Sequence, residues 1–160
     1  MATTFDRLSA LADCLCAELE KAGTPNLCFC GVLPGEVASA DYMGGCGDKN
    51  GMAWVRLKNM YPSTSVGTAN VTVGNCDKEI GFDVEMGVMR VYSVGDSRGN
   101  PPTAKQSLDA AAMQIMDAET MLKAINCCDA ISSRDYIVGL YEPAGPEGGI
   151  VGGMWTISMI

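Results

Sequence analysis

The cysteines are the residues whose type and spacing could hold a metal, and there are eight: Cys14, Cys16, Cys28, Cys30, Cys46, Cys76, Cys127 and Cys128. A four-cysteine zinc site drawn from Cys28, Cys30, Cys46 and Cys76 is one hypothesis. Structural zinc sites favour two to four residues between paired cysteines, so a Cys-x-Cys pair fits imperfectly. The alternatives are small buried apolar residues, or disulfides if the finished protein ends up outside a cell. We expect no metal and no other cofactor.

Histidine is absent from the sequence. Its absence removes imidazole general bases, Ser-His and Cys-His dyads, and the commonest ligands of catalytic zinc. The glycine clusters fail the test for a phosphate-binding loop. No Gly-Lys-Ser/Thr ending is present, and no Gly-x-Gly-x-x-Gly joins an expected strand to a helix.

Asp83 and Glu85 are the carboxylates whose spacing invites a chemical interpretation. Two positions apart on one strand, they lie on the same face with roughly 7 Å between their α-carbons. Such a pair could act as acid and base, but no partner nucleophile or Asp-rich metal motif accompanies it. A solvated polar sheet face explains the pair more simply, so we do not predict an enzyme. Trp54 and Trp155 are either interface anchors or core residues.

Composition limits the partners. The net charge of −8 argues against a large phosphate-contacting surface, because affinity for nucleic acid depends mostly on Lys and Arg. No stretch approaches the roughly 20 apolar residues that would span a bilayer. The N-terminal residues lack the basic start and the apolar run of a signal peptide, so we expect synthesis in a reducing cytosol.

Hydrophobic periodicity predicts a single domain, residues 1–160, with α+β architecture. Neighbouring strands joined by turns favour a mixed, mostly antiparallel sheet of about five strands with two helices on one side. A long excursion, residues 61–75, is expected to form an extended arm. In the order α-β-β-β-α-β-β, the expected elements are a helix over 4–21, strands over 27–33, 52–60 and 80–92, a helix over 104–126, and strands over 136–142 and 150–159.

Each expected helix carries one apolar stripe. Thr103 and Gln106 form a capping box that begins the second helix. The stripe predicted to be buried on the first helix is Phe5, Leu8, Leu11, Ala12, Leu15 and Leu19. The corresponding stripe on the second helix is Leu108, Ala112, Ile115, Ala118, Leu122 and Ile125.

Four short motifs add a specific resemblance. They are GMAWVRL at 51–57 followed by YPS at 61–63, E-x-G-V-x-R at 85–90, D-x-x-G-N-P-P-T at 96–103, and GPEGGIVGGMWT at 145–156. Together they resemble head-to-tail connector proteins of actinobacterium-infecting (mycobacteriophage-like), long-tailed siphophages, specifically the tail-terminator type. The resemblance covers roughly residues 27–156.

The resemblance implies a virion protein of the tail and neck, assembled in the host cytoplasm as a homohexameric ring. Such a ring ends tail-tube polymerisation and contacts the tail-tube protein and a head-completion, or stopper, protein. DNA passes through its lumen without specific binding. On this basis Asp83 and Glu85 are the predicted lumen-facing residues, and Trp54, Tyr61 and Trp155 the predicted interface residues. Alternative functions are a head-closure ring, a tail-tube subunit, or a cysteine-based zinc-binding module.

Overall fold

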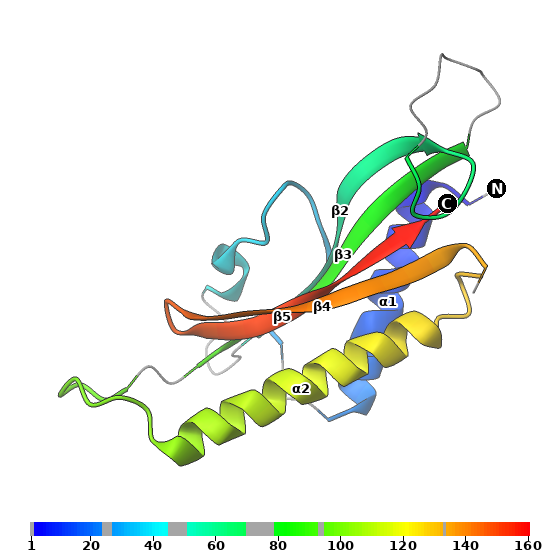
Figure 1. The fold of residues 1–160 in the computed structure, drawn as a ribbon. Helices are drawn as coiled ribbons and strands as arrows, with labels where there is room; N and C mark the ends of the chain where they lie inside the picture. Colours follow the sequence, from blue (N-terminus) through cyan, green and yellow to red (C-terminus); the bar gives the residue numbers. More distant parts are fainter. Residues whose placement is uncertain (1, 24–26, 45–50, 70–78, 93–94, 133) are drawn as a thin grey trace.

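The computed structural model describes residues 2–23, 27–44, 51–69, 79–92, 95–132 and 134–160. Its strands form one sheet in the order β1-β2-β3-β5-β4, with β1 parallel to β2 and all other neighbours antiparallel. The predicted α+β fold class and element order are confirmed (Figure 1). The elements are α1 (Thr4–Lys21), β1 (Phe29–Leu33), the 3-10 helix η1 (Ala40–Met43), β2 (Gly51–Ser63), β3 (Glu79–Val91), α2 (Ala104–Asn126), β4 (Tyr136–Glu147) and β5 (Ile150–Met159).

Both long helices begin with a capping box. In α2, the hydroxyl of Thr103 accepts the backbone N–H of Gln106, and the Gln106 side chain accepts the backbone N–H of Thr103. Thr3 and Asp6 make the same reciprocal pair at the start of α1. Each box satisfies two backbone donors that a helix start leaves free, so the sequence fixes where both helices begin.

β2 and β3 are the longest strands, thirteen residues each, and they pair along nearly their whole length. β2 continues to Ser63, so Tyr61 belongs to the sheet and not to a separate arm. The expectation of an arm over 61–75 is therefore wrong for its first three residues. Its last six, 70–75, fall outside the described residues.

The β4–β5 hairpin closes the far edge of the sheet, and β4 runs five residues beyond its predicted end. Its turn consists of Gly148 and Gly149, whose φ angles are 57° and 77°. A two-residue turn with two positive φ angles matches the twist of paired strands, and glycine adopts it without steric cost.

The main core lies between the sheet and the two helices. α1 packs on β1 and β2, whereas α2 packs mainly on β5 and also on β3. Every second residue of β3 from Phe82 to Val88 points into this layer, because strand side chains alternate between faces. The helices contribute Leu11, Leu15, Met121 and Ile125.

The predicted helix stripes are buried only in part. Leu11 and Leu15 are fully buried, but Phe5 at the start of α1 is 68% exposed. On α2, Leu108 and Ile115 are 68% and 58% exposed, and burial is concentrated after Gln114. The prediction is wrong there because α2 diverges from the β4–β5 hairpin toward its own beginning, as Figure 1 shows.

Candidate functional site

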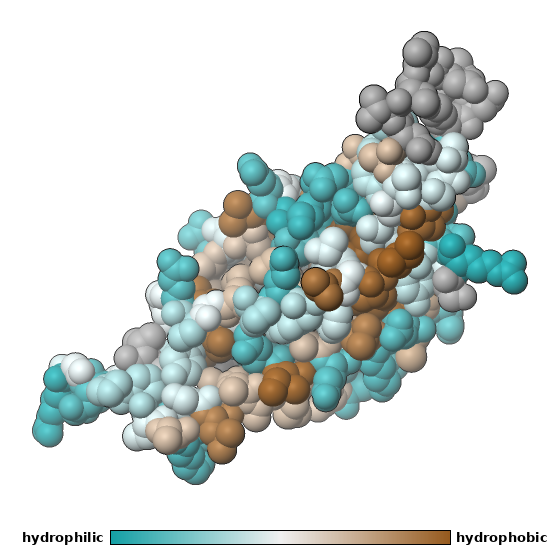
Figure 2. Space-filling view, viewed as in Figure 1, coloured by the Kyte–Doolittle hydropathy of each residue, from teal (hydrophilic) through white to brown (hydrophobic). Residues whose placement is uncertain are grey.

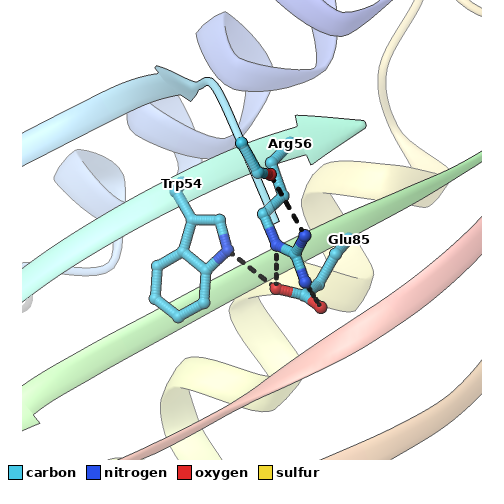
Figure 3. Close-up of polar contacts among 4 residues, drawn as sticks. Trp54, Arg56 and Glu85 are labelled. Carbon is cyan, nitrogen blue, oxygen red and sulfur yellow. Dashed lines mark hydrogen bonds and ion pairs between the residues drawn. The ribbon is translucent and has the colours of Figure 1, made fainter. Parts of the chain in front are cut away.

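The sheet face opposite the helices carries a buried polar centre. The register places Arg56 of β2 directly across from Glu85 of β3. Arg56 Nε and Nη2 donate to the two oxygens of Glu85 at 2.7 and 2.6 Å, and Trp54 Nε1 donates to Oε1 at 3.1 Å (Figure 3). A fourth contact runs from Arg56 Nη1 to the carbonyl oxygen of Gly35 at 3.4 Å. Two parallel N–H···O bonds fix the orientation of both ions.

Glu85 is 5% exposed and Arg56 is 9% exposed. Both oxygens of Glu85 accept hydrogen bonds, from a guanidinium and an indole, and the buried side chain is not presented to a passing molecule. The prediction that Glu85 faces a lumen as an open carboxylate is therefore wrong for this subunit. Strand alternation places the residue on the face opposite the helices, as predicted, but a second layer covers that face at this point.

The covering layer forms a small second core of Leu33, Met52 and Trp54, with Phe29, Ala38, Met43 and Met89 around it. Trp54 is completely buried there and lies over Gly87, where an added Cβ would overlap its ring. Trp54 is thus a core residue of this subunit and not the exposed interface anchor that the sequence suggested.

Asp83 forms a separate cluster on the same face, nearer the outer end of β3. It accepts hydrogen bonds from Tyr61 Oη at 3.1 Å, Ser158 Oγ at 2.7 Å and, at 3.4 Å, Asn59 Nδ2. Burial and the neighbouring carboxylate raise the pKa of Tyr61, so the phenol remains a donor at neutral pH. Asp83 is half-buried and remains the member of the predicted pair that reaches solvent.

The Ser158–Asp83 contact does not make a nucleophile by itself. A carboxylate is a weak base toward a serine hydroxyl, because their ordinary pKa values are far apart. Tyr61 Oη donates to the same oxygen of Asp83, so that oxygen does not serve Ser158 alone. The cluster is suited to joining β2, β3 and β5 at their ends.

Trp155 lies on the opposite, helix-facing side, away from these clusters. Its Nε1 donates to the carbonyl of Ala118 at 3.0 Å, and its ring packs 5.4 Å from that of Tyr141. Burial, followed by the charge of Asp117, raises the pKa of Tyr141. Trp155 therefore ties β5 to α2 within one subunit, although it is only half-buried.

A second buried ion pair joins β3 to α2, and the sequence analysis missed it. Arg90 Nε and Nη2 donate to Asp117 at 2.6 and 2.9 Å, with both side chains 4% exposed. The sequence nevertheless contains a pattern that predicts this pair. Arg90 is two residues after the buried Val88, so both lie on the same face of β3. Asp117 lies four and eight residues before the buried Met121 and Ile125, so it shares their face of α2. Charges on two apolar faces predict a pair, since unpaired buried charges are costly.

Five of the six described cysteines form disulfides. Cys14 bonds Cys128 and Cys16 bonds Cys30, with α-carbons 5.7 and 5.9 Å apart. The hypothesis of a zinc site is overturned, because Cys30 is disulfide-bonded to Cys16 and Cys28 is also disulfide-bonded, so neither sulfur can bind zinc as a thiolate. Two members of that proposed set, Cys46 and Cys76, fall outside the described residues. Within the described ranges no cluster of three or more Cys, Asp or Glu side chains could hold a metal.

None of the helices in the described part of the chain has the length and apolar character needed to cross a membrane. Comparison with known proteins gives no relationship: no protein-family model and no curated protein sequence matches this chain.

Proposed function

We propose that this chain is a phage virion protein of the tail-terminator type. Identical copies form a homohexameric ring at the head-proximal end of a long, non-contractile tail. The ring stops polymerisation of the tail tube on one face and receives the head-completion protein on the other. It is a structural protein of the tail and neck, and catalysis has no part in this role.

The observation that carries the proposal is the position of the residues responsible for the resemblance. Trp54 and Arg56 come from the first motif, and Glu85 and Arg90 from the second. The first three meet in the buried polar centre, while Arg90 anchors β3 to α2. The second motif's glycine, Gly87, makes room for the Trp54 ring. The two motifs therefore act together as the framework of one sheet.

The third motif supports the same interpretation. Asp96 accepts the backbone N–H groups of Arg98 and Asn100 and the side-chain amide of Asn100. The bond from the Asn100 side chain, then those from the backbone of Asn100 and Arg98, lower the pKa of Asp96 below its ordinary value, and together they tie the turn before α2. As with the first two motifs, its polar residues organise the fold.

The electrostatics suit a lumen through which DNA passes without being held. The chain carries a net charge of −8, and each Lys or Arg contact with a phosphate would add affinity. On the proposed ring Asp83 is the remaining lumen candidate, since it is the half-buried carboxylate of the polar face. The disulfides further favour a protein whose working life is outside a reducing compartment.

Electron microscopy of tails assembled with and without this protein tests the proposal. Without it, we expect tails of uncontrolled, excessive length that fail to join filled heads, and supplying the protein in trans should restore normal length. Tails of normal length in its absence would refute termination. Long tubes formed by the purified protein alone would identify a tail-tube subunit instead.

A further inference from the structure

The first half of α2 presents an apolar ridge that its own subunit leaves uncovered. Leu108, Ile115 and Met116 are 68%, 58% and 48% exposed, and the intervening Ala111 and Ala112 are exposed as well. Leu108, Ala112 and Ile115 are spaced i, i+4, i+7, which places them on one side of the helix. Figure 2 shows hydrophobic side chains along α2 and over β4 on this face of the molecule.

A groove of about 860 Å³ lies at the other edge of the sheet. Its apolar lining includes Phe5 and Leu8 of α1, Val32 of β1, and Leu57 and Met60 of β2. The groove exists because β1 stops at Leu33, paired with Arg56, while β2 continues for seven further residues. Beyond that point no strand of the described part of the chain pairs with the outer edge of β2.

The two surfaces lie on opposite sides of the subunit. α1 covers β1 and β2 at one edge of the sheet, and α2 covers β5 toward the other edge. Two different surfaces on opposite sides suit a heterologous contact, in which each copy binds one neighbour through its ridge and the other neighbour through its groove. A ridge that paired with itself would instead stop at a dimer.

We propose that the α2 ridge of one copy seats in the β1–β2 groove of the next copy. The inference rests on the proposed ring and names the contact that builds it. An amphipathic helix with anchors at i, i+4 and i+7 is a standard occupant of an apolar groove. Each rim also carries one charge of either sign, so each charge of one can meet an opposite charge of the other: Lys58 and Glu36 border the groove, and Asp109 and Lys105, which pair with each other in the free subunit, flank the ridge.

The outer edge of β4 is the competing contact, because Leu140 there is 82% exposed. However, β4 has register shifts at Val138/Tyr141 and Ala144/Glu147 and contains Pro143 and Pro146. Bulges and prolines are devices that prevent an edge strand from pairing with another chain. The ridge has no comparable obstruction.

Three single variants of the full chain test the contact: Leu108→Lys on the ridge, Phe5→Lys on the groove and Leu140→Lys on β4 as the matched control. All three positions are exposed, so circular dichroism should show unchanged folds. Analytical ultracentrifugation should show association weakened roughly 30-fold or more by either of the first two, as expected for anchor residues. Leu140→Lys should assemble as the wild type does.

Mixing the two defective variants gives the decisive result. Phe5→Lys retains its ridge and Leu108→Lys retains its groove, so an equimolar mixture should form one-to-one dimers that grow no further. Dimers of Phe5→Lys alone would indicate ridge-to-ridge contact and overturn the inference. If only Leu140→Lys prevented ring formation, the contact would be made by β4. That result would overturn the ridge-and-groove inference but not the proposal that the chain forms a ring. A wild-type chain that stays monomeric at its solubility limit also overturns it, whereas the tail-length experiment tests the proposed function separately.

Discussion

At Glu85, one carboxylate holds two side chains of the neighbouring strand. The pair that it makes with Arg56 is bidentate and almost fully buried. Removing one member of such a pair leaves the other charge without a partner in a medium where water cannot replace it. The consequence should be a loss of folding stability and not a loss of any particular reaction.

We therefore expect Glu85→Gln to lower the free energy of unfolding by about 3 kcal/mol, measured by urea denaturation. Lys105→Gln is the control, since its ion pair with Asp109 is exposed on both sides (85% and 66%). That control should leave stability unchanged. A Glu85→Gln protein as stable as the wild type would show that the guanidinium finds solvent or another acceptor.

Gly87 supports a second prediction at the residue scale. Gly87→Ala places a methyl group into the ring of Trp54, which is fully buried, and should cost about 2–3 kcal/mol by the same measurement. In a Trp54→Leu background the same Gly87→Ala substitution should cost less than it does in the wild type, because the smaller side chain frees the space. Gly31→Ala is the control, since its nearest neighbour is the ring tip of Phe29 at 3.3 Å. Equal losses at both glycines would contradict the steric explanation.

At the scale of elements, Glu18 connects the two helices. It binds Lys123 of α2 at 2.8 Å and Lys21 of its own helix at 2.7 Å. The hydrogen bond from Lys123, then that from Lys21, lowers the pKa of Glu18 below its ordinary value. A lowered carboxyl pKa contributes stability above the unfolded-state pKa, and that contribution disappears as pH falls through the folded-state pKa.

Wild-type stability should therefore decline on acidification through the range in which Glu18 becomes protonated. Glu18→Gln should decline less steeply there and start from lower stability at neutral pH. Thermal unfolding as a function of pH measures both. Glu20→Gln removes an exposed carboxylate from the same helix and should keep the wild-type slope. A Glu18→Gln slope equal to that of the wild type would mean that other carboxyls dominate the acid response.

The elements also show what the sequence could and could not reveal. Helix starts were predictable, because Thr103 and Gln106 satisfy backbone donors locally. The burial of the apolar stripe on α2 was not predictable, since periodicity shows which side of a helix is apolar but not whether the same subunit covers it. Glu85 was misjudged for a related reason: alternation assigns a face, but it does not show that Trp54 and Arg56 of β2 enclose the carboxylate there.

At the scale of the whole molecule, two disulfides connect distant parts of the chain to α1. Cys14 and Cys16 leave the helix in divergent directions, which their spacing indicates, but their partners depend on the fold. Cys14–Cys128 spans 114 positions and Cys16–Cys30 spans 14. A cross-link that closes a longer loop removes more freedom from the unfolded chain.

We expect Cys14→Ser/Cys128→Ser to lower unfolding free energy by about 5 kcal/mol and Cys16→Ser/Cys30→Ser by about 3 kcal/mol. Denaturation with and without reductant measures both. Cys127→Ser should have no effect, because this neighbouring cysteine is free and exposed. If reductant did not change the free energy of unfolding, the prediction would be contradicted. That result would mean that apolar contacts alone hold α1 in position.

The two chain termini lie side by side, as Figure 1 shows, and Arg7 donates to the carbonyl of Ile160. Thr4 lines both the apolar groove and the hollow next to Ile160. An affinity tag fused before Ala2 would therefore emerge beside the groove and occupy the space that the proposed contact assigns to a neighbouring copy. If that contact forms, a permanent N-terminal tag should hold the protein as single subunits, and cleaving the tag should start assembly at a chosen moment.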